Sequence, residues 1–289
     1  MYHKTTGYRV FSACNYIFLI TLSVLCILPL IHLMAVSFSG PAPANAGLIT
    51  FWPKDFTIEA YQKTFDNPNF LNSMWISVQR TVLGTILSMT VTTCAAYALS
   101  KEKVLGGRNA YMWYFIFTML FSGGIIPGYI LITKLGLINT LWALILPGLV
   151  GVYNIILMLN FFRNIPRELE EAAVIDGANH FQTFLRVYLP ISMPSIATIT
   201  LFIIVGHWNS YFDGLIYMRE VEKLPLATLL QTIVVQTDFT NMDPETVKKL
   251  SQRTVKSAQI FISLIPILAI YPFLQKYFVH GIVLGAVKE

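Results

Sequence analysis

The sequence predicts an all-α, polytopic membrane protein with six transmembrane helices. Of its 289 residues 55% are apolar and only 12% are charged, a composition too apolar for an ordinary soluble domain. It also contains apolar runs of about 20 residues, the length that a helix needs to cross a hydrocarbon core of roughly 30 Å with its backbone paired internally. The six runs are Asn15–Ser37, Thr81–Leu99, Tyr111–Ile132, Leu141–Phe162, Pro194–Tyr217 and Gln259–Phe278.

The first run has an alternative interpretation. It follows Lys4 and Arg9 and precedes small residues at 42, 44 and 46, which is also the pattern of a cleaved signal peptide. Its apolar stretch is longer than the roughly 7 to 15 residues of a signal core. A retained first helix is therefore favoured.

The distribution of Lys and Arg favours cytoplasmic termini. The segments that would then lie inside carry basic residues close to the helix ends, whereas six of the outer ones fall in the long stretch Arg219 to Lys256. Charge in short segments near helix ends has the greater weight in setting topology. The net charge of +5 suits a protein facing anionic lipid, and no clustered basic patch indicates nucleic-acid binding.

Several classes of chemistry have no sequence support. There is no phosphate-binding G-x-x-x-x-G-K-[ST] loop, no H-E-x-x-H and no G-x-S-x-G, the motifs of nucleotide hydrolysis, zinc hydrolases and serine hydrolases. Cys14, Cys26 and Cys94 lack metal-binding spacing. We expect no catalytic residue, metal or cofactor, so any driving energy must come from elsewhere.

The segment 163–190 between the fourth and fifth runs is the most informative loop. It reads as two short amphipathic helices: Pro166 suits the start of the first, Gly177 interrupts the pattern and Asn179 can cap the second. Small residues around Gly177 leave a smooth surface, with Glu171 and Asp176 available for pairing. From the residues alone this surface is either a docking site or a loop lying on the membrane surface.

A resemblance adds to this reading. Glu171-Ala172-Ala173, three residues, Gly177, nine residues and Val187-Tyr188-Leu189-Pro190 resemble the EAA loop of ABC importer permeases, E-A-A-x3-G-x9-I-x-L-P, with Val in place of Ile. From about Asn72 onward the chain is similar to the maltose-type carbohydrate permeases, in the branch for oligo- and polysaccharide uptake. Supporting stretches are Gly123–Pro127, Leu137–Trp142, His207–Asp213 and Gly281–Lys288.

The resemblance implies the type-I importer permease fold, in the bacterial cytoplasmic membrane, without enzymatic activity. It implies four kinds of partner: a second homologous permease, a cytoplasmic ABC ATPase dimer, an extracytoplasmic solute-binding protein and a carbohydrate substrate. The division implied is an N-terminal part, 1–71, and a permease core, 72–289, with the coupling loop at 163–190 and a long outer loop at 218–258. An ABC permease for a non-sugar solute and a secondary transporter are the alternatives.

In that family the loop forms a coupling helix seated in a cleft of the ATPase. Carried over, Glu171 pairs with a basic residue of the ATPase, Ala172 and Ala173 pack against its cleft, and Gly177 allows the turn. The C-terminal tail, Gly285–Glu289, is a weaker second contact. The expected coupling residues are Glu171, Ala172, Ala173, Asp176, Gly177, Leu189 and Pro190.

The fifth run carries candidates for a substrate path. Gly206, Asn209, Ser210 and Asp213 fall at helical spacing on one face, and polar residues within spans usually face a bundle interior or a water-filled cavity. Aromatic neighbours could stack on sugar rings, or both groups could serve helix packing alone. Arg80 is expected only to reach the membrane interface. The candidates are His207, Trp208, Asn209, Tyr211 and Asp213.

The segments expected outside, 39–73 and 218–258, are long for linkers. The second contains an amphipathic stretch, Leu224–Val235. Both are expected docking surfaces for a solute-binding protein, although the sequence singles out no contact residue.

Overall fold

The computed structural model describes residues 5–101, 105–235 and 253–286, and every regular element in these ranges is a helix. The chain divides into two compact units, Met1–Phe70 with Thr232–Ile265, and Leu71–Gln231 with Pro266–Glu289. The predicted all-α class agrees with these helices. Residues 236–252 of the expected outer loop and 287–289 of the expected tail contact lie outside the described residues.

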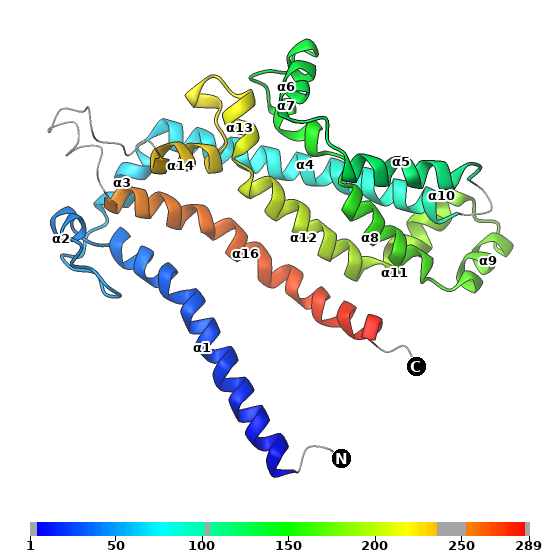
Figure 1. Cartoon of the computed structure of the whole chain (residues 1–289), viewed down its shortest axis with the longest axis horizontal. Coiled ribbons are helices and arrows are strands. Elements are labelled where there is room, and N and C mark those ends of the chain that lie inside the picture. The colour runs from blue at the N-terminus through cyan, green and yellow to red at the C-terminus, as the bar shows by residue number, and fades with distance from the viewer. Residues whose placement is uncertain (1–4, 102–104, 236–252, 287–289) are drawn as a thin grey trace. The chain divides into compact units, whose positions relative to one another are not determined.

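Three of the six predicted spans are continuous helices (Figure 1). These are α1 (Thr6–Ser37), α4 (Pro68–Ser100) and α16 (Arg253–Ala286), and each is long and apolar enough to cross a membrane. Each extends beyond the apolar run from which it was predicted, because polar residues at a span's ends can continue the helix outside the hydrocarbon. α16 runs through Pro266 and Pro272.

The other three predicted spans are broken, which corrects the expectation of continuous helices. The run Tyr111–Ile132 forms α5 (Arg108–Leu120) and α6 (Ile125–Lys134), which meet at 111°. Gly124 lies at the break with φ +88° and ψ 174°, a conformation that residues with a Cβ avoid. The adjacent pair Gly123-Gly124 therefore permits the sharp change in direction.

The fourth and fifth runs break for different reasons. α7 (Leu141–Ile145) and the short helix η2 (Leu146–Gly148) meet α8 (Val152–Arg163) at 50°, next to Pro147 and two glycines. α12 (Met193–Asn209) ends where the backbone of Ser210 becomes extended, and α13 (Phe212–Tyr217) follows. The predicted run Pro194–Tyr217 therefore does not form a single helix.

The core of the second unit lies around the C-terminal end of α4. Ala96 and Leu99 of α4 pack with buried residues of α8 and α12 and with Phe184 and Tyr188 of the loop between them. Burial between membrane helices gains its stability mainly from close packing, since lipid is itself apolar. Figure 1 shows α8, α9, α10 and α11 gathered at this end of α4.

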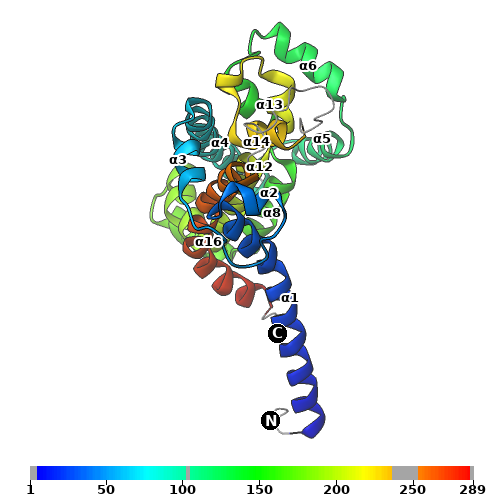
Figure 2. The same cartoon turned by 90° about the vertical axis from the view of Figure 1, so that its left-hand side faces the viewer.

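A second group of elements gathers around α13. Both views show α6 beside α13 (Figures 1 and 2). Asn139, which follows α6, donates to Glu220 at 2.7 Å, and its backbone N–H donates to the carbonyl oxygen of Tyr217. The expected amphipathic stretch is helical, as α14 (Leu226–Val235), and the N–H of Leu226 donates to Ser77 of α4 at 2.7 Å.

The first unit contains α1, α2 (Pro41–Asn45), α3 (Glu59–Phe65) and the start of α16. Its small buried core joins Ala35 and Val36 of α1 to Ala44 and Ile49. The remaining length of α1 is different, because none of its most apolar stretch is buried. That surface requires lipid or another protein to cover it.

Candidate functional site

The predicted coupling loop begins with α9 (Arg167–Ile175), which follows Pro166 as its N-cap. α9 ends in a Schellman motif: the N–H of Ala178 donates to the carbonyl of Ala173 at 2.9 Å, and that of Gly177 to Val174 at 3.0 Å. Gly177 has φ +80°, which a glycine adopts without steric cost. The turn expected at Gly177 is thus made by backbone hydrogen bonds alone.

The second helical part of the loop is capped as expected. Asn179 accepts a hydrogen bond from the N–H of Gln182 at 2.9 Å, and the Gln182 side chain accepts from the N–H of Asn179 at 3.0 Å. This reciprocal capping box satisfies two N–H groups that a helix start leaves unpaired. It opens α10 (His180–Thr183), which continues through a π-helical turn (Phe184–Tyr188) into α11 (Leu189–Ile191).

The loop presents an apolar surface. No residue of α9 is buried, and Ile175 is 85% exposed and Val174 57% exposed. Phe181 on α10 is also exposed. Of the predicted coupling residues, Glu171, Ala172, Asp176, Gly177 and Pro190 are exposed, and Ala173 and Leu189 are half-buried. Val174 and Ile175 are adjacent, and adjacent exposed apolar side chains indicate a surface for another protein.

A charged cluster joins this loop to α4. Lys101, directly after α4, lies 2.6 Å from the Glu170 carboxylate of α9. Tyr188 donates a hydrogen bond to the same carboxylate at 2.8 Å and accepts one from Lys101 at 2.7 Å. The Lys101 ammonium also lies over the rings of Tyr188 and Tyr97, 4.0 and 4.6 Å from their centres. We call Lys101, Glu170 and Tyr188 the anchor cluster.

Burial and charge act against each other in the anchor cluster. Partial burial by itself would raise the pKa of the Glu170 carboxyl, but the hydrogen bonds from Lys101 and Tyr188 outweigh it, so the pKa lies below its usual value. Burial and the neighbouring Glu170 carboxylate raise the pKa of Tyr188. At neutral pH the cluster therefore contains a charged carboxylate and a neutral phenol. A cavity of about 710 Å³ lies beside it, lined in part by Glu171, Val174 and Ile175.

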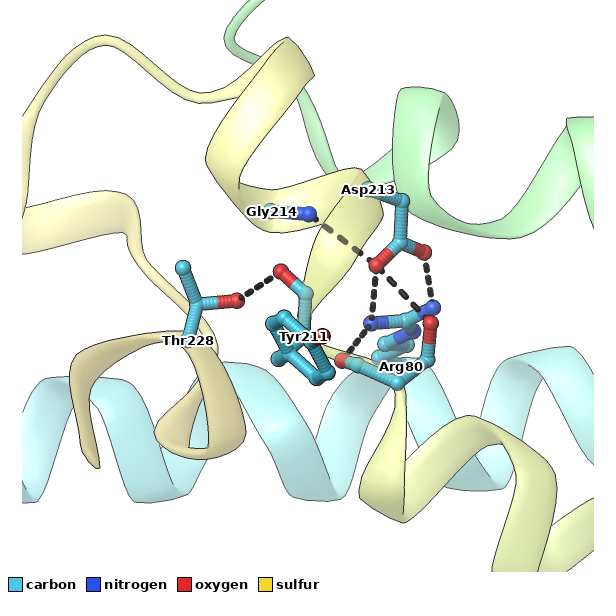
Figure 3. A network of polar contacts seen from close by, with 6 residues as sticks. Arg80, Tyr211, Asp213, Gly214 and Thr228 are labelled. Atoms are coloured by element: carbon cyan, nitrogen blue, oxygen red, sulfur yellow. Dashed lines mark hydrogen bonds and ion pairs between the residues drawn. The ribbon is translucent and has the colours of Figure 1, made fainter. Parts of the chain in front are cut away.

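A second polar site lies between α4, α8 and the break after α12. Arg80 of α4 forms an ion pair with Asp213 of α13 through both terminal nitrogens, and it donates to the carbonyl of Ser210 at 2.9 Å (Figure 3). Ser210 and the N–H of Gly214 also donate to Asp213. Arg80 is 2% exposed. The expectation that it merely reaches the interface is therefore wrong: it pairs with a carboxylate that lies far away in sequence.

The Arg80–Asp213 pair occurs where helix α12 stops. A broken helix leaves carbonyl groups unpaired, and at membrane depth these need partners within the protein. Arg80 donates to the carbonyl of Ser210, whereas the carbonyl of Tyr211 accepts both the N–H of Leu215 at 3.1 Å and the hydroxyl of Thr228 at 2.8 Å (Figure 3). Gly214 allows the close approach, because a Cβ there would lie 2.1 Å from the Thr228 hydroxyl oxygen.

This break separates the predicted substrate-path residues. His207 and Asp213 both line a cavity of about 260 Å³, together with Gly206 and Ser210. Asn209 and Tyr211 are exposed and Trp208 is buried, and none of the three is among the residues lining that cavity. The expectation that Asn209 and Asp213 share one helical face fails, since the helix ends between them.

Several other residues of these two sites could not be identified from the sequence. Lys101, Glu170 and Tyr188 carry no motif that distinguishes them, although Glu170 and Tyr188 adjoin matched motif positions. Ser88 and Asn154 line the 260 Å³ cavity, but single polar residues in apolar runs give little signal. Among the described residues no group of three His, Cys, Asp or Glu side chains could hold a metal ion.

Comparison with known proteins agrees with this architecture. Residues 107–284 match the family of binding-protein-dependent transport system inner membrane components, and the chain belongs to that family. It is therefore a multi-pass membrane permease, as the resemblance in its loop predicted.

The chain is similar along its whole length to curated relatives. It is 42% identical over 288 residues to protein LplC of Bacillus subtilis (strain 168), covering 99% of this chain and 97% of LplC. It is 39% identical to the polygalacturonan/rhamnogalacturonan transport system permease protein YtcP of the same organism, covering 97% and 99%.

A solved structure confirms the predicted permease fold. One chain of a bacterial ABC transporter involved in the import of the acidic polysaccharide alginate matches with a TM-score of 0.86 and 33% identity, covering 95% of this chain and 98% of that one. A chain of a bacterial alginate ABC transporter in complex with a periplasmic protein matches at 14% identity and a TM-score of 0.60, which is a likeness of fold alone.

Proposed function

We propose that this chain is one of two membrane subunits of an ATP-driven oligosaccharide importer, and that residues 163–190 couple it to a separate ATPase. The observation that carries the proposal is the loop's combination of exposure and anchorage. α9 presents Val174 and Ile175 to the outside, while Glu170 on the same helix is held to Lys101 at the end of α4. A partner that moves α9 would therefore move α4.

The carbohydrate substrate is supported by the relatives. YtcP is named for polygalacturonan and rhamnogalacturonan, and the similar solved structure for alginate. These are polysaccharides built from sugar acids or containing them. We therefore infer an oligosaccharide substrate, delivered by an extracytoplasmic binding protein to the side opposite the coupling loop.

The remaining partners follow from the same assignment. None of the most apolar stretch of α1 is buried, and such a helix suits packing against a second, homologous permease within lipid. With the coupling loop at the ATPase, the two chain termini lie in the cytoplasm, since six spans return the chain to its starting side.

The test measures coupling in the assembled importer. The chain is purified with its co-encoded permease and ATPase, reconstituted in liposomes, and assayed for ATP hydrolysis stimulated by the binding protein. Gly177→Asp and Glu171→Ala should each reduce this stimulation at least about tenfold. Gly177→Asp distorts the turn after α9, and Glu171→Ala removes the charge that we propose pairs with a basic residue of the ATPase. Unchanged stimulation in both variants would contradict the coupling role.

The chain offers a matched control. α6 also ends in a Schellman motif, with the N–H of Leu137 donating to Ile132 and that of Gly136, at φ +69°, to Thr133. Gly136→Asp imposes the same backbone cost away from the loop. It should leave co-purification of the ATPase intact, whereas Gly177→Asp should reduce it.

A further inference from the structure

Two broken spans meet at the 260 Å³ cavity. Gly148 and Gly151 line it from the break before α8, and Ser210 lines it from the break after α12. Interrupted helices at membrane depth are tolerated where they are buried in protein or line a polar cavity. The N-terminal end of α8 adds a partial positive charge beside the cavity. Broken helices also line the substrate sites of secondary transporters.

The cavity wall contains polar atoms without partners. Nε of Arg80 and the hydroxyl of Ser88 are buried, and neither has a hydrogen-bond partner in the described structure. Arg80 and Ser88 are 2% and 3% exposed, and both line the cavity. Native proteins rarely leave buried polar groups unpaired. Both atoms are closed off from solvent, so the polar side chains that a ligand in the cavity can meet are those of Asn154, His207 and Asp213.

The charges of the wall select the kind of ligand. Asp213 already neutralises the terminal nitrogens of Arg80, so the pair has no net charge to offer an ion. A ligand carboxylate would also lie close to the Asp213 carboxylate and be repelled. Hydroxyl groups suit the wall better, because each can donate to Asp213 or to the amide oxygen of Asn154 and accept from the amide nitrogen of Asn154.

The volume of the cavity and the apolar part of its wall further restrict which ligands can bind. About 260 Å³ is the bulk volume of roughly eight or nine waters and lies below the range of about 300 to 1,000 Å³ typical of drug-sized ligands. Phe202, 47% exposed, gives the cavity an aromatic surface. A single sugar ring has this combination of hydroxyl edges and apolar C–H faces.

We propose that this cavity, formed by Arg80, Ser88, Asn154, Phe202, His207 and Asp213, binds one ring of the transported saccharide through its hydroxyl groups. The proposal rests on the function proposed above and gives this subunit a direct part in substrate recognition. Arg80 and Asp213 hold each other in position, while Asn154 discriminates among ring hydroxyls.

The first test is a thiol-labelling experiment on the assembled importer. Gly206 lines the cavity, and a Cβ built there meets nothing within 4 Å, so Gly206→Cys places a thiol in open space. The native Cys14, Cys26 and Cys94 are replaced by Ser. Maltotriose, galactotriose and trigalacturonate are then tested for slowing of maleimide labelling. Ser122→Cys, exposed in the loop between α5 and α6, is the control.

At least one sugar should slow labelling of Cys at 206 by about fivefold or more and leave the control unaffected. Adding Asn154→Ala should remove this protection. If no sugar protects, or if protection survives Asn154→Ala, the proposal is wrong. Protection that appears only with trigalacturonate and is lost when its carboxylates are esterified would also overturn recognition through hydroxyls.

The second test separates this proposal from the coupling role. Asn154→Ala should raise the KM for uptake of the protecting sugar about tenfold or more. Gly177→Asp should instead abolish uptake without changing sugar protection. If a sugar protects Cys at 206 in a chain that couples to no ATPase, the proposed sugar site stands and the proposed importer function is wrong.

Discussion

Lys101 and Glu170 lie 69 positions apart in the sequence, yet their charged groups are 2.6 Å apart and only 10% and 24% exposed. Lys101 immediately follows α4, and Glu170 lies within α9, whose surface faces outward. The pair therefore joins the part of the chain that a partner can reach to the longest helix of the second unit. Tyr188 closes the cluster by hydrogen-bonding to both.

Lys101→Met should weaken coupling more than it weakens folding. The change leaves Glu170 with one hydrogen-bond donor fewer, and hydrogen bonds to charged groups contribute about 1.5 to 3 kcal/mol. Stimulated ATP hydrolysis should fall several-fold while the purified complex still assembles. Lys223→Met removes an exposed pair with Glu220 and should change neither property, as exposed pairs contribute little. Equal effects of the two changes would rule out a special role for the anchor cluster.

The anchor cluster also predicts an acid dependence of stability. The pKa of Glu170 is lowered in the folded chain by the hydrogen bonds from Lys101 and Tyr188, against the effect of burial. Its contribution is therefore fully present above the unfolded pKa of about 4.3 and is lost as the pH falls through the lower, folded pKa. The Tm of the wild-type complex in detergent should exceed that of Glu170→Gln at pH 7, and the difference should shrink below about pH 4. A constant difference across this range would contradict the assignment.

Breaking the Arg80–Asp213 pair on one side should destabilise the chain strongly. Removing one partner of a buried pair leaves an uncompensated charge and costs about 3 to 5 kcal/mol. Asp213→Leu alone should therefore lower the Tm of the purified complex more than Arg80→Met with Asp213→Leu together. If the double variant is the less stable, the pair contributes more than mutual neutralisation, and the freed carbonyl of Ser210 becomes the dominant loss.

Gly84 tests how closely α4 and α12 pack. A Cβ at this position would lie 2.5 Å from Nε2 of His207, so Gly84→Ala should cost about 1 to 3 kcal/mol through overpacking. Adding His207→Ala should relieve the clash and recover part of the loss in thermal stability. Gly206→Ala, one residue before His207 and with open space around its Cβ, should be neutral or slightly stabilising. A tolerated Gly84→Ala would show that the helices can separate freely.

The membrane-spanning helices could be predicted from the sequence insofar as the thickness of the lipid bilayer determines their length and apolar composition. A span needs about 20 apolar residues wherever it lies in a fold, so the six runs could be read directly. The break at Gly124 was not predictable in the same way, because glycine and proline also occur in unbroken membrane helices. Whether a span breaks depends on partners for the freed backbone groups, and those partners come from other helices.

In the two sites, too, residues with a local requirement could be predicted from the sequence, and residues with distant partners could not. Gly177 could be identified because a positive φ is a local requirement that glycine meets. This glycine also lies at a fixed spacing from Glu171. Arg80 could not be paired from sequence, since Asp213 lies 133 residues away and either residue alone has several explanations. His207 and Asp213 were identified as polar residues in an apolar run, but their neighbours Asn209 and Tyr211 are directed elsewhere by a break that the pattern does not reveal.

The turn after α9 is made by main-chain atoms and one glycine, and no outward side chain of α9 takes part in it. Residues 171–175 can therefore be exchanged without undoing the loop, as long as Gly177 and the anchor cluster are kept. Folding and partner choice are thus separable properties of one short segment. In the proposed coupling role, a few surface side chains of α9 would then determine which ATPase is bound, with the membrane core left as it is.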